Sequence, residues 1–104
     1  MNGGGAAGPG GGPAGPPHRL KVTLYGRPGC HLCDDALAVI ERVRSRVYFE
    51  LEQRDIESSD QWFKRYLERI PVVEVDGREA FELFVDEQQL EQMLVGLNGG
   101  HSPQ

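Results

Sequence analysis

The sequence predicts an α/β domain with the element order β-α-β-α-β-β-α, in which helices flank a four-stranded mixed sheet. Three observations support this. Apolar and polar residues alternate over 20–25, as in a half-buried strand. Apolar residues then recur at helical spacing from Leu32 to Val43. Asp76-Gly77, between two short apolar runs, is a strong hairpin signal.

The first strand is followed by a turn and a helix. Leu20, Val22 and Leu24 supply the alternating apolar side chains, and the segment 26–29 (Gly-Arg-Pro-Gly) ends the strand. The helix is predicted to run to about Arg46. Its first turn carries two aspartates and its last turn three arginines, which suits the helix dipole.

A second strand and a second helix come next. Residues 47–55 predict the strand, and Ser58 with Gln61 three positions later resembles a capping box. The helix that follows is expected to end near Arg69. Its aromatic residues are expected in the core rather than in a binding box; they are Trp62, Phe63 and Tyr66.

The last three elements begin after Pro71, which cannot continue a helix. Residues 72–75 and 78–83 predict an antiparallel hairpin, with Phe81 and Leu83 on one face. Asp86 is expected to cap a last helix that ends at Leu97, before Asn98-Gly99. The first two strands, joined through a helix, should be parallel with a right-handed crossover.

Composition divides the chain into unlike parts. Of the 14 glycines and 7 prolines, 8 and 4 fall in residues 1–17, which carry no charged side chain. Such a segment cannot bury enough apolar surface to offset its ordering entropy. We therefore predict a disordered tail over 1–18, one domain over 19–97 and a disordered C-terminus over 98–104.

Composition also excludes several classes of protein. No apolar run approaches the roughly 20 residues that span a bilayer, and no secretory signal is present. The formal net charge of −5 argues against nucleic acid as a partner. Two cysteines are no disulfide framework for a secreted mini-protein. We expect a cytoplasmic monomer.

Cys30-His31-Leu32-Cys33 lies where the first strand leads into the first helix. Unpaired N–H groups and the dipole at a helix N-terminus stabilise an anion, which lowers the pKa of a cysteine there. The thiolate is the nucleophile of thiol–disulfide exchange. Cys30, at the helix start, is therefore the expected nucleophile, and Cys33, one turn further in, the expected resolving cysteine.

Neighbouring charges act on Cys30 in both directions. Arg27 and any protonated fraction of His31 favour its thiolate, whereas Asp34 and Asp35 oppose it. We expect the helix terminus and Arg27 to prevail, since the carboxylates can face water. His31 either tunes Cys30 or is an exposed helix residue, and the sequence does not decide between the two.

A C-x-x-C pair also occurs in zinc sites and as two inert packed thiols. A zinc site needs two further ligands, and the other histidines, His18 and His101, lie near the ends of the chain. We therefore predict no metal site. Redox chemistry is favoured because C-x-x-C beside a β-α-β pattern is a redox signature.

Four segments in this order carry a resemblance to a known family: 25–36 with its C-H-L-C motif, Asp55-Ile56, 69–72 (Arg-Ile-Pro-Val) and 76–79 (Asp-Gly-Arg-Glu). They resemble the glutaredoxin-like branch of the thioredoxin superfamily, and more narrowly the glutaredoxin-like proteins of the DUF836 type. The resemblance covers about residues 20–95 and implies a thioredoxin fold.

The resemblance also implies roles for single residues. Cys30 corresponds to the nucleophile and Cys33 to the resolving cysteine. Ile70 and Pro71 correspond to the cis-proline segment that faces the dithiol and presents backbone to a bound substrate. Arg27 takes the place of a basic residue that contacts glutathione.

The sequence departs from glutaredoxins at two places. His31-Leu32 replaces Pro-Tyr between the cysteines. Leu83-Phe84 replaces a Gly-Gly pair after the fourth strand, although Asp86 keeps the acidic residue that helps hold glutathione. Bulky side chains there oppose the close backbone approach that glycine permits.

We therefore expect a thiol–disulfide oxidoreductase that acts on a protein disulfide or, as second candidate, on glutathione, with no metal or organic cofactor. The competing hypothesis is a non-enzymatic thioredoxin-fold module whose thiols bind a metal, an iron–sulfur cluster or a protein partner.

Overall fold

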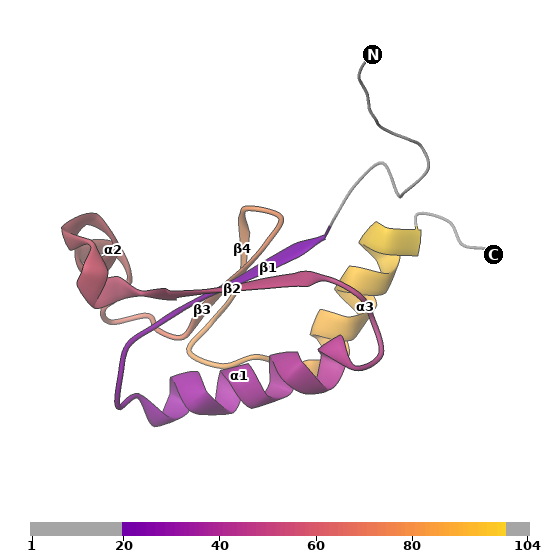
Figure 1. The fold of residues 1–104 in the computed structure, drawn as a ribbon, viewed down its shortest axis with the longest axis horizontal. Helices are drawn as coiled ribbons and strands as arrows, with labels where there is room; N and C mark the ends of the chain where they lie inside the picture. The colour runs from indigo at the N-terminus through magenta and orange to yellow at the C-terminus, as the bar shows by residue number, and fades with distance from the viewer. Residues whose placement is uncertain (1–19, 100–104) are drawn as a thin grey trace, which may run out of the picture.

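The computed structural model describes residues 20–99 (Figure 1). Its elements are β1 (Lys21–Gly26), α1 (His31–Arg44), β2 (Glu50–Asp55), the 3₁₀ turn η1 (Ile56–Ser58), α2 (Asp60–Tyr66), β3 (Val72–Val75), β4 (Arg78–Glu82) and α3 (Glu87–Gly99). The predicted order of strands and helices is confirmed. The predicted tail over 1–18, and most of the predicted C-terminal segment, lie outside the described residues.

The sheet has the strand order β2-β1-β3-β4. β1 pairs in parallel with β2 and antiparallel with β3, and β3 pairs antiparallel with β4. This confirms the mixed sheet predicted from the sequence. At the hairpin, Asp76 and Gly77 have φ values of 52° and 83°, the two positive values that a type I′ turn requires.

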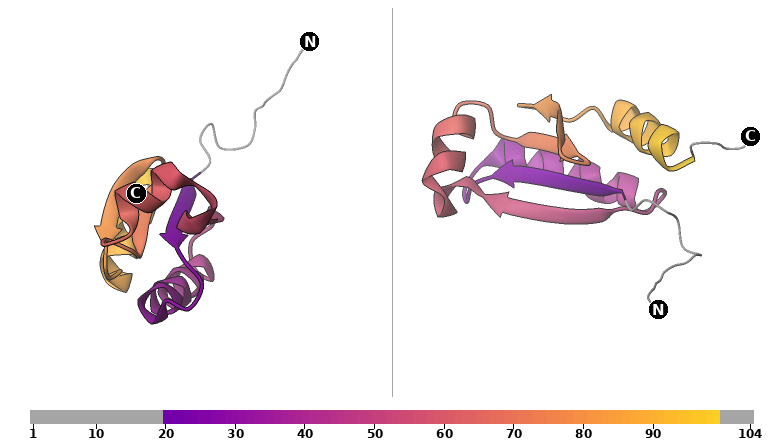
Figure 2. Two further views of the ribbon diagram at one scale, coloured as in Figure 1. Left: turned by 90° about the vertical axis from the view of Figure 1, so that its left-hand side faces the viewer. Right: turned by 90° about the horizontal axis from the view of Figure 1, so that it is seen from above.

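One face of the sheet packs against α1 and α3, while α2 lies at one end of the sheet (Figures 1 and 2). The core on the helical face joins strand residues such as Val22 and Val73 to Ile40 of α1 and Leu90 of α3. A second cluster, built around Tyr25, packs on α2 and extends to the start of α1. This second cluster carries the cysteines.

Several predicted boundaries are wrong by a few residues, each for a local reason. α1 ends at Arg44, and the N–H of Val47 donates to the carbonyl of Val43 at 2.9 Å. This bond ties Val47 to the last turn of the helix. β2 therefore begins only at Glu50, whose N–H donates to the carbonyl of Leu20. At the other end of the chain, α3 continues to Gly99, two residues past the predicted end at Leu97.

The predicted cap of α2 is wrong by one residue, whereas the predicted cap of α3 is confirmed. Ser59, not Ser58, caps α2: its hydroxyl accepts the N–H of Trp62 at 3.2 Å. Ser58 lies in η1, where its hydroxyl donates to the carbonyl of Asp55. α2 then ends at Tyr66, three residues before the predicted end. Asp86 caps α3 as predicted, accepting the N–H of Gln89 at 3.0 Å.

The end of β4 contradicts the predicted facing pair of Phe81 and Leu83. Phe81 packs against the core, whereas Leu83 has left the strand with φ 70° and is exposed. A register shift between Val73 and Glu74 also breaks the alternation of the hairpin. Among residues 20–99, no helix is long and apolar enough to span a membrane.

Phe49 and its neighbour Tyr48 allow a paired test of the core. Phe49 is fully buried, whereas Tyr48 is 71% exposed. Replacing Phe49 by Ala should lower the free energy of unfolding by about 3–5 kcal/mol, because it leaves a cavity. Tyr48→Ala should change it by less than about 0.5 kcal/mol. Urea unfolding of both variants checks this, and equal losses would contradict it.

Candidate functional site

The site begins where β1 passes into α1. Gly29 adopts φ 78°, and Cys30 follows with extended backbone as the N-cap residue of α1. The Cys30 sulfur accepts the backbone N–H of Cys33 at 3.2 Å. A sulfur thus fills the place that a Ser or Asp oxygen takes at most helix N-termini, and the positive end of the helix dipole lies against it.

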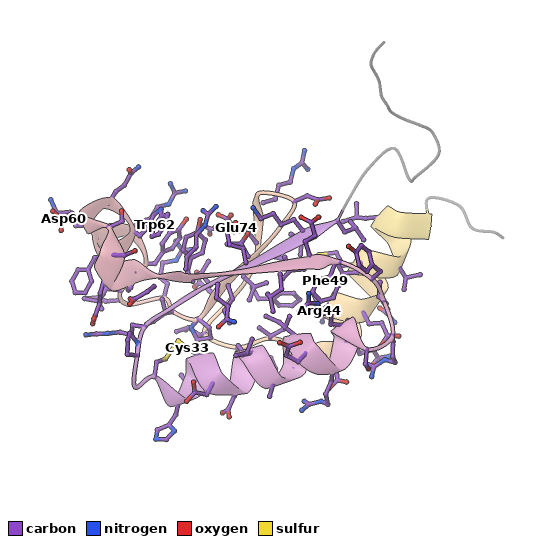
Figure 3. The ribbon with its side chains drawn as sticks, in the orientation of Figure 1. Cys33, Arg44, Phe49, Asp60, Trp62 and Glu74 are labelled. Carbon is purple, nitrogen blue, oxygen red and sulfur yellow. A yellow bond between two sulfur atoms is a disulfide. The ribbon has the colours of Figure 1, made fainter. Side chains whose placement is uncertain are left out.

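The two cysteines are joined as a disulfide, with their Cα atoms 5.2 Å apart, within the range usual for disulfides. Cys30 is partly exposed, whereas Cys33 is only 6% exposed. Cys33 lies between the N-terminal end of α1 and the sheet (Figure 3). Of the pair, Cys30 is thus the sulfur more open to an incoming reactant.

Gly26 makes room for Cys33. A Cβ atom at Gly26 would lie 3.0 Å from the Cys33 sulfur and 3.1 Å from its Cβ. From the sequence, we predict only that this glycine helps to end the first strand. Its spacing of seven residues from Cys33 carries no local signal, because the contact depends on how α1 folds back over β1.

Ile70 belongs to the cluster that contains Cys33, and Pro71 follows it in the chain. The bond between them is cis, and Ile70 packs in one cluster with Cys33 and Cys30. The Pro71 carbonyl accepts the N–H of Leu83 at 2.8 Å. This bond ties the end of β4 to the segment that packs on the cysteines.

Arg27 is held by two neighbours. Its Nε and Nη2 both donate to Oε2 of Glu57, at 3.0 and 2.6 Å, and its guanidinium carbon lies 5.8 Å from the centre of the Phe63 ring. Arg27 and Cys33 also line a cavity of about 300 Å³. The sequence placed Arg27 near the dithiol but did not reveal Glu57, which lies 30 residues further on.

The two remaining predicted residues are placed differently. His31 is the first residue of α1, next to Cys30, and is exposed. The carboxylate of Asp86 is engaged in capping α3. His31 is therefore next to Cys30 by its position in the chain, whereas the side-chain contact described for Asp86 belongs to the cap of α3.

An aromatic layer supports the site from the side of α2. Tyr25 and Tyr66 stack with centroids 4.3 Å apart, and burial raises the pKa of Tyr66 to about 12. Trp62 and Phe63 are half-buried in the same cluster, which agrees with their predicted core role. Trp62 and Glu74 lie on the side of the sheet opposite α1 (Figure 3).

Within residues 20–99, no three His, Cys, Asp or Glu side chains are grouped so as to hold a metal ion. His18 and His101 lie outside the described residues.

Comparison with known proteins identifies the family of the chain and agrees with its fold. Residues 21–95 match the family described as "Glutaredoxin-like domain (DUF836)". A glutaredoxin-like protein of Dictyostelium discoideum is 29% identical over 77 residues, which cover 68% of this chain and 71% of that protein. The resemblance drawn from the sequence is confirmed.

Solved structures show the same fold. Protein Ne2328 from Nitrosomonas europaea aligns with a TM-score of 0.65 and 29% identity, covering 74% of this chain and 93% of that one. A structural-genomics target from X. campestris aligns at 0.60 and 30%, covering 70% and 93%. A thioredoxin variant from Halobacterium salinarum aligns at 0.62 with 16% identity, covering 85% and 81%, and confirms the thioredoxin fold.

The contact between Gly26 and Cys33 predicts the effect of one added methyl group. Gly26→Ala should lower the free energy of unfolding of the oxidised protein by about 1–3 kcal/mol, through overpacking against Cys33. Gly96→Ala, in α3 with open space around the new Cβ, should raise it by about 0.5–1 kcal/mol. Urea unfolding compares the two, and a gain in stability from Gly26→Ala would refute the contact.

Glu52 gives the protein a defined dependence on acid. A hydrogen bond from Arg54, reinforced by Lys21, lowers the pKa of its carboxyl from 4.5 to about 2. The folded state therefore binds this proton less readily than the unfolded chain. The resulting stabilisation is present above pH 4.5 and is lost as the pH falls towards 2.

Glu52→Gln should accordingly destabilise the protein at pH 6 and leave it close to wild type at pH 2. Urea midpoints at the two pH values measure the difference. A deficit that persists unchanged at pH 2 would show that the carboxylate contributes through something other than its charge.

Proposed function

Because the chain belongs to the glutaredoxin-like (DUF836) family, we propose that it is a thiol–disulfide oxidoreductase in which Cys30 is the nucleophile and Cys33 the resolving cysteine. The observation that carries this proposal is the bond from the Cys33 N–H to the Cys30 sulfur at the N-terminus of α1. Two sulfurs within bonding distance could be inert, but a partly exposed sulfur in a capping position is suited to ionisation.

The capping position favours the thiolate of Cys30 over its thiol. When the disulfide is reduced, a negative sulfur accepts the Cys33 N–H as a charge-assisted bond, which is stronger than the bond to a neutral sulfur. α1 has 14 residues, so its dipole is fully developed at this end. The same interactions do little for Cys33, which lies inside the first turn.

The reaction proceeds by two exchanges. The Cys30 thiolate attacks one sulfur of a substrate disulfide, forms a mixed disulfide and releases the other sulfur as a thiolate. The Cys33 thiol then loses its proton to solvent and attacks the Cys30 sulfur. This closes the Cys30–Cys33 disulfide and releases the second substrate thiolate. The substrate gains two electrons, and an external thiol restores the reduced dithiol.

The cofactors, substrates and cellular compartment that we propose follow from this reaction. The electrons pass through two sulfurs of one chain, so neither a metal, an organic cofactor nor a second subunit takes part. The substrates are protein disulfides or mixed disulfides with glutathione. A compartment with abundant thiols, such as the cytoplasm, would keep the protein in its reduced, active form.

Single-cysteine variants test the two roles. Cys30→Ser should reduce a disulfide substrate no faster than the protein-free reaction, because the nucleophile is missing. Cys33→Ser should stop at the mixed disulfide, which mass spectrometry detects as one substrate thiol bound per protein, with at most a monothiol activity remaining. Cys30→Ser acting at the wild-type rate would refute the assignment.

A further inference from the structure

Large apolar side chains are exposed at the end of β4, beside the segment that packs on the cysteines. Leu83 is 47% exposed and Phe84 is 68% exposed. The N–H of Leu83 donates to the carbonyls of Pro71 and Arg69, at 2.8 and 3.1 Å. Ile70, between those two residues, belongs to the same cluster as Cys33, against which Cys30 packs, so these hydrogen bonds tie the exposed pair to a segment of the cysteine cluster. A third exposed apolar residue, Leu32 at 53%, lies between the two cysteines in the chain.

The backbone of Leu83 indicates that this exposure serves a purpose other than folding. Its φ of 70° lies in the left-handed region, which costs energy for any residue with a Cβ and little for glycine. Its side chain is half in solvent, so core packing does not compensate for that cost. A leucine at this position weakens the fold relative to glycine while presenting an apolar surface.

Arg27, the cation that precedes the dithiol in the chain, is already paired with a carboxylate of the protein itself. Arg27 lies three residues before Cys30, and both of its described N–H donations go to one carboxylate oxygen of Glu57. A carboxylate on an incoming substrate would have to displace Glu57 to reach this guanidinium. Displacement would leave the carboxylate of Glu57 without its cation. An acidic group near the substrate sulfur would therefore gain little binding energy from Arg27.

We propose that the substrate is a polypeptide whose disulfide cysteine is flanked by apolar side chains, which dock on Leu83 and Phe84, and that Glu57 selects against acidic flanks by holding Arg27. This proposal rests on the oxidoreductase function above and assigns its substrate class. The exchange itself is unchanged: Cys30 attacks the peptide disulfide and Cys33 completes the two-electron reduction.

Three peptides provide the test, each joined through its cysteine to 2-mercaptoethanol as a mixed disulfide. Their sequences are Ac-Ala-Leu-Cys-Leu-Ala-NH2, the same peptide with Ser in place of Leu, and the same peptide with Glu in place of Leu. The measurement is the second-order rate constant for oxidation of the reduced protein by each peptide. Wild type should react about tenfold faster with the Leu peptide than with the Ser peptide, as burial of part of a leucine side chain allows.

Leu83→Gly and Phe84→Ala should each reduce this preference to about twofold or less. Leu83→Gly should also raise the urea midpoint, because it relieves the left-handed backbone, so a loss of preference cannot be ascribed to unfolding. Leu97→Ala, at an exposed leucine of α3, is the matched control and should keep the tenfold preference. A wild type that does not distinguish the Leu and Ser peptides, or a Leu83→Gly variant that keeps the full preference, would overturn the docking surface.

The Glu peptide tests the second half of the proposal. Wild type should react with it more slowly than with the Ser peptide, and Glu57→Gln should reverse that order by freeing Arg27. The gain should diminish with added salt, since it is electrostatic. An unchanged order in Glu57→Gln would overturn the role of Glu57.

Failure of the oxidoreductase function would be recognised separately. If wild type reacts with none of the three disulfides, NMR of the oxidised protein with Ac-Ala-Leu-Ser-Leu-Ala-NH2 reports docking alone. Shifts at Leu83 and Phe84 that the peptide with Ser at all three central positions does not cause would support the docking surface without turnover, and their absence would overturn it.

Discussion

The hydrogen bond from the Cys33 N–H to the Cys30 sulfur is the contact on which the rest of the site depends. It places the sulfur at the first turn of α1, where the N–H groups of the helix have no intrahelical partners. The turn after β1, with Gly29 in the left-handed region, brings the chain into this geometry. Without that placement the two cysteines would still be neighbours, but the helix terminus would no longer favour the proposed thiolate of Cys30.

The difference between the two sulfurs extends into the packing. Cys33 faces inward against Gly26 and the cluster around Tyr25, so its surroundings fix its position. Cys30 has one side open to solvent. In the proposed reaction, this arrangement would let the mixed disulfide form at the accessible Cys30 and be resolved by the buried Cys33.

Local patterns in the sequence predict most of the fold and the position of the cysteine pair at the start of α1. Asp76-Gly77 fixes its hairpin because two positive φ values are needed and these residues tolerate them. The ends of the elements are harder to predict. Phe49 is buried like a strand residue, but it lies before β2, because the residues just before it are hydrogen-bonded to the last turn of α1. The roles of Gly26 and Glu57 could not be predicted, because each depends on a contact made only when separate elements pack together. The predicted facing of Leu83 is wrong, because the alternation of apolar and polar residues does not show at which residue a strand ends.

The unpredicted contacts divide the site into two parts of different origin. The two sulfurs and their helix terminus lie within one continuous stretch of chain, so a short motif is enough to specify the proposed sulfur chemistry. The groups proposed to select the substrate come from η1 and from the loop after β4, which approach the motif only in the folded state. A substitution at Leu83 or Glu57 therefore changes neither the helix cap nor the inward packing of Cys33. On this fold the residues outside the motif can change while the cysteine pair stays the same, and resemblance in the motif alone does not identify a substrate.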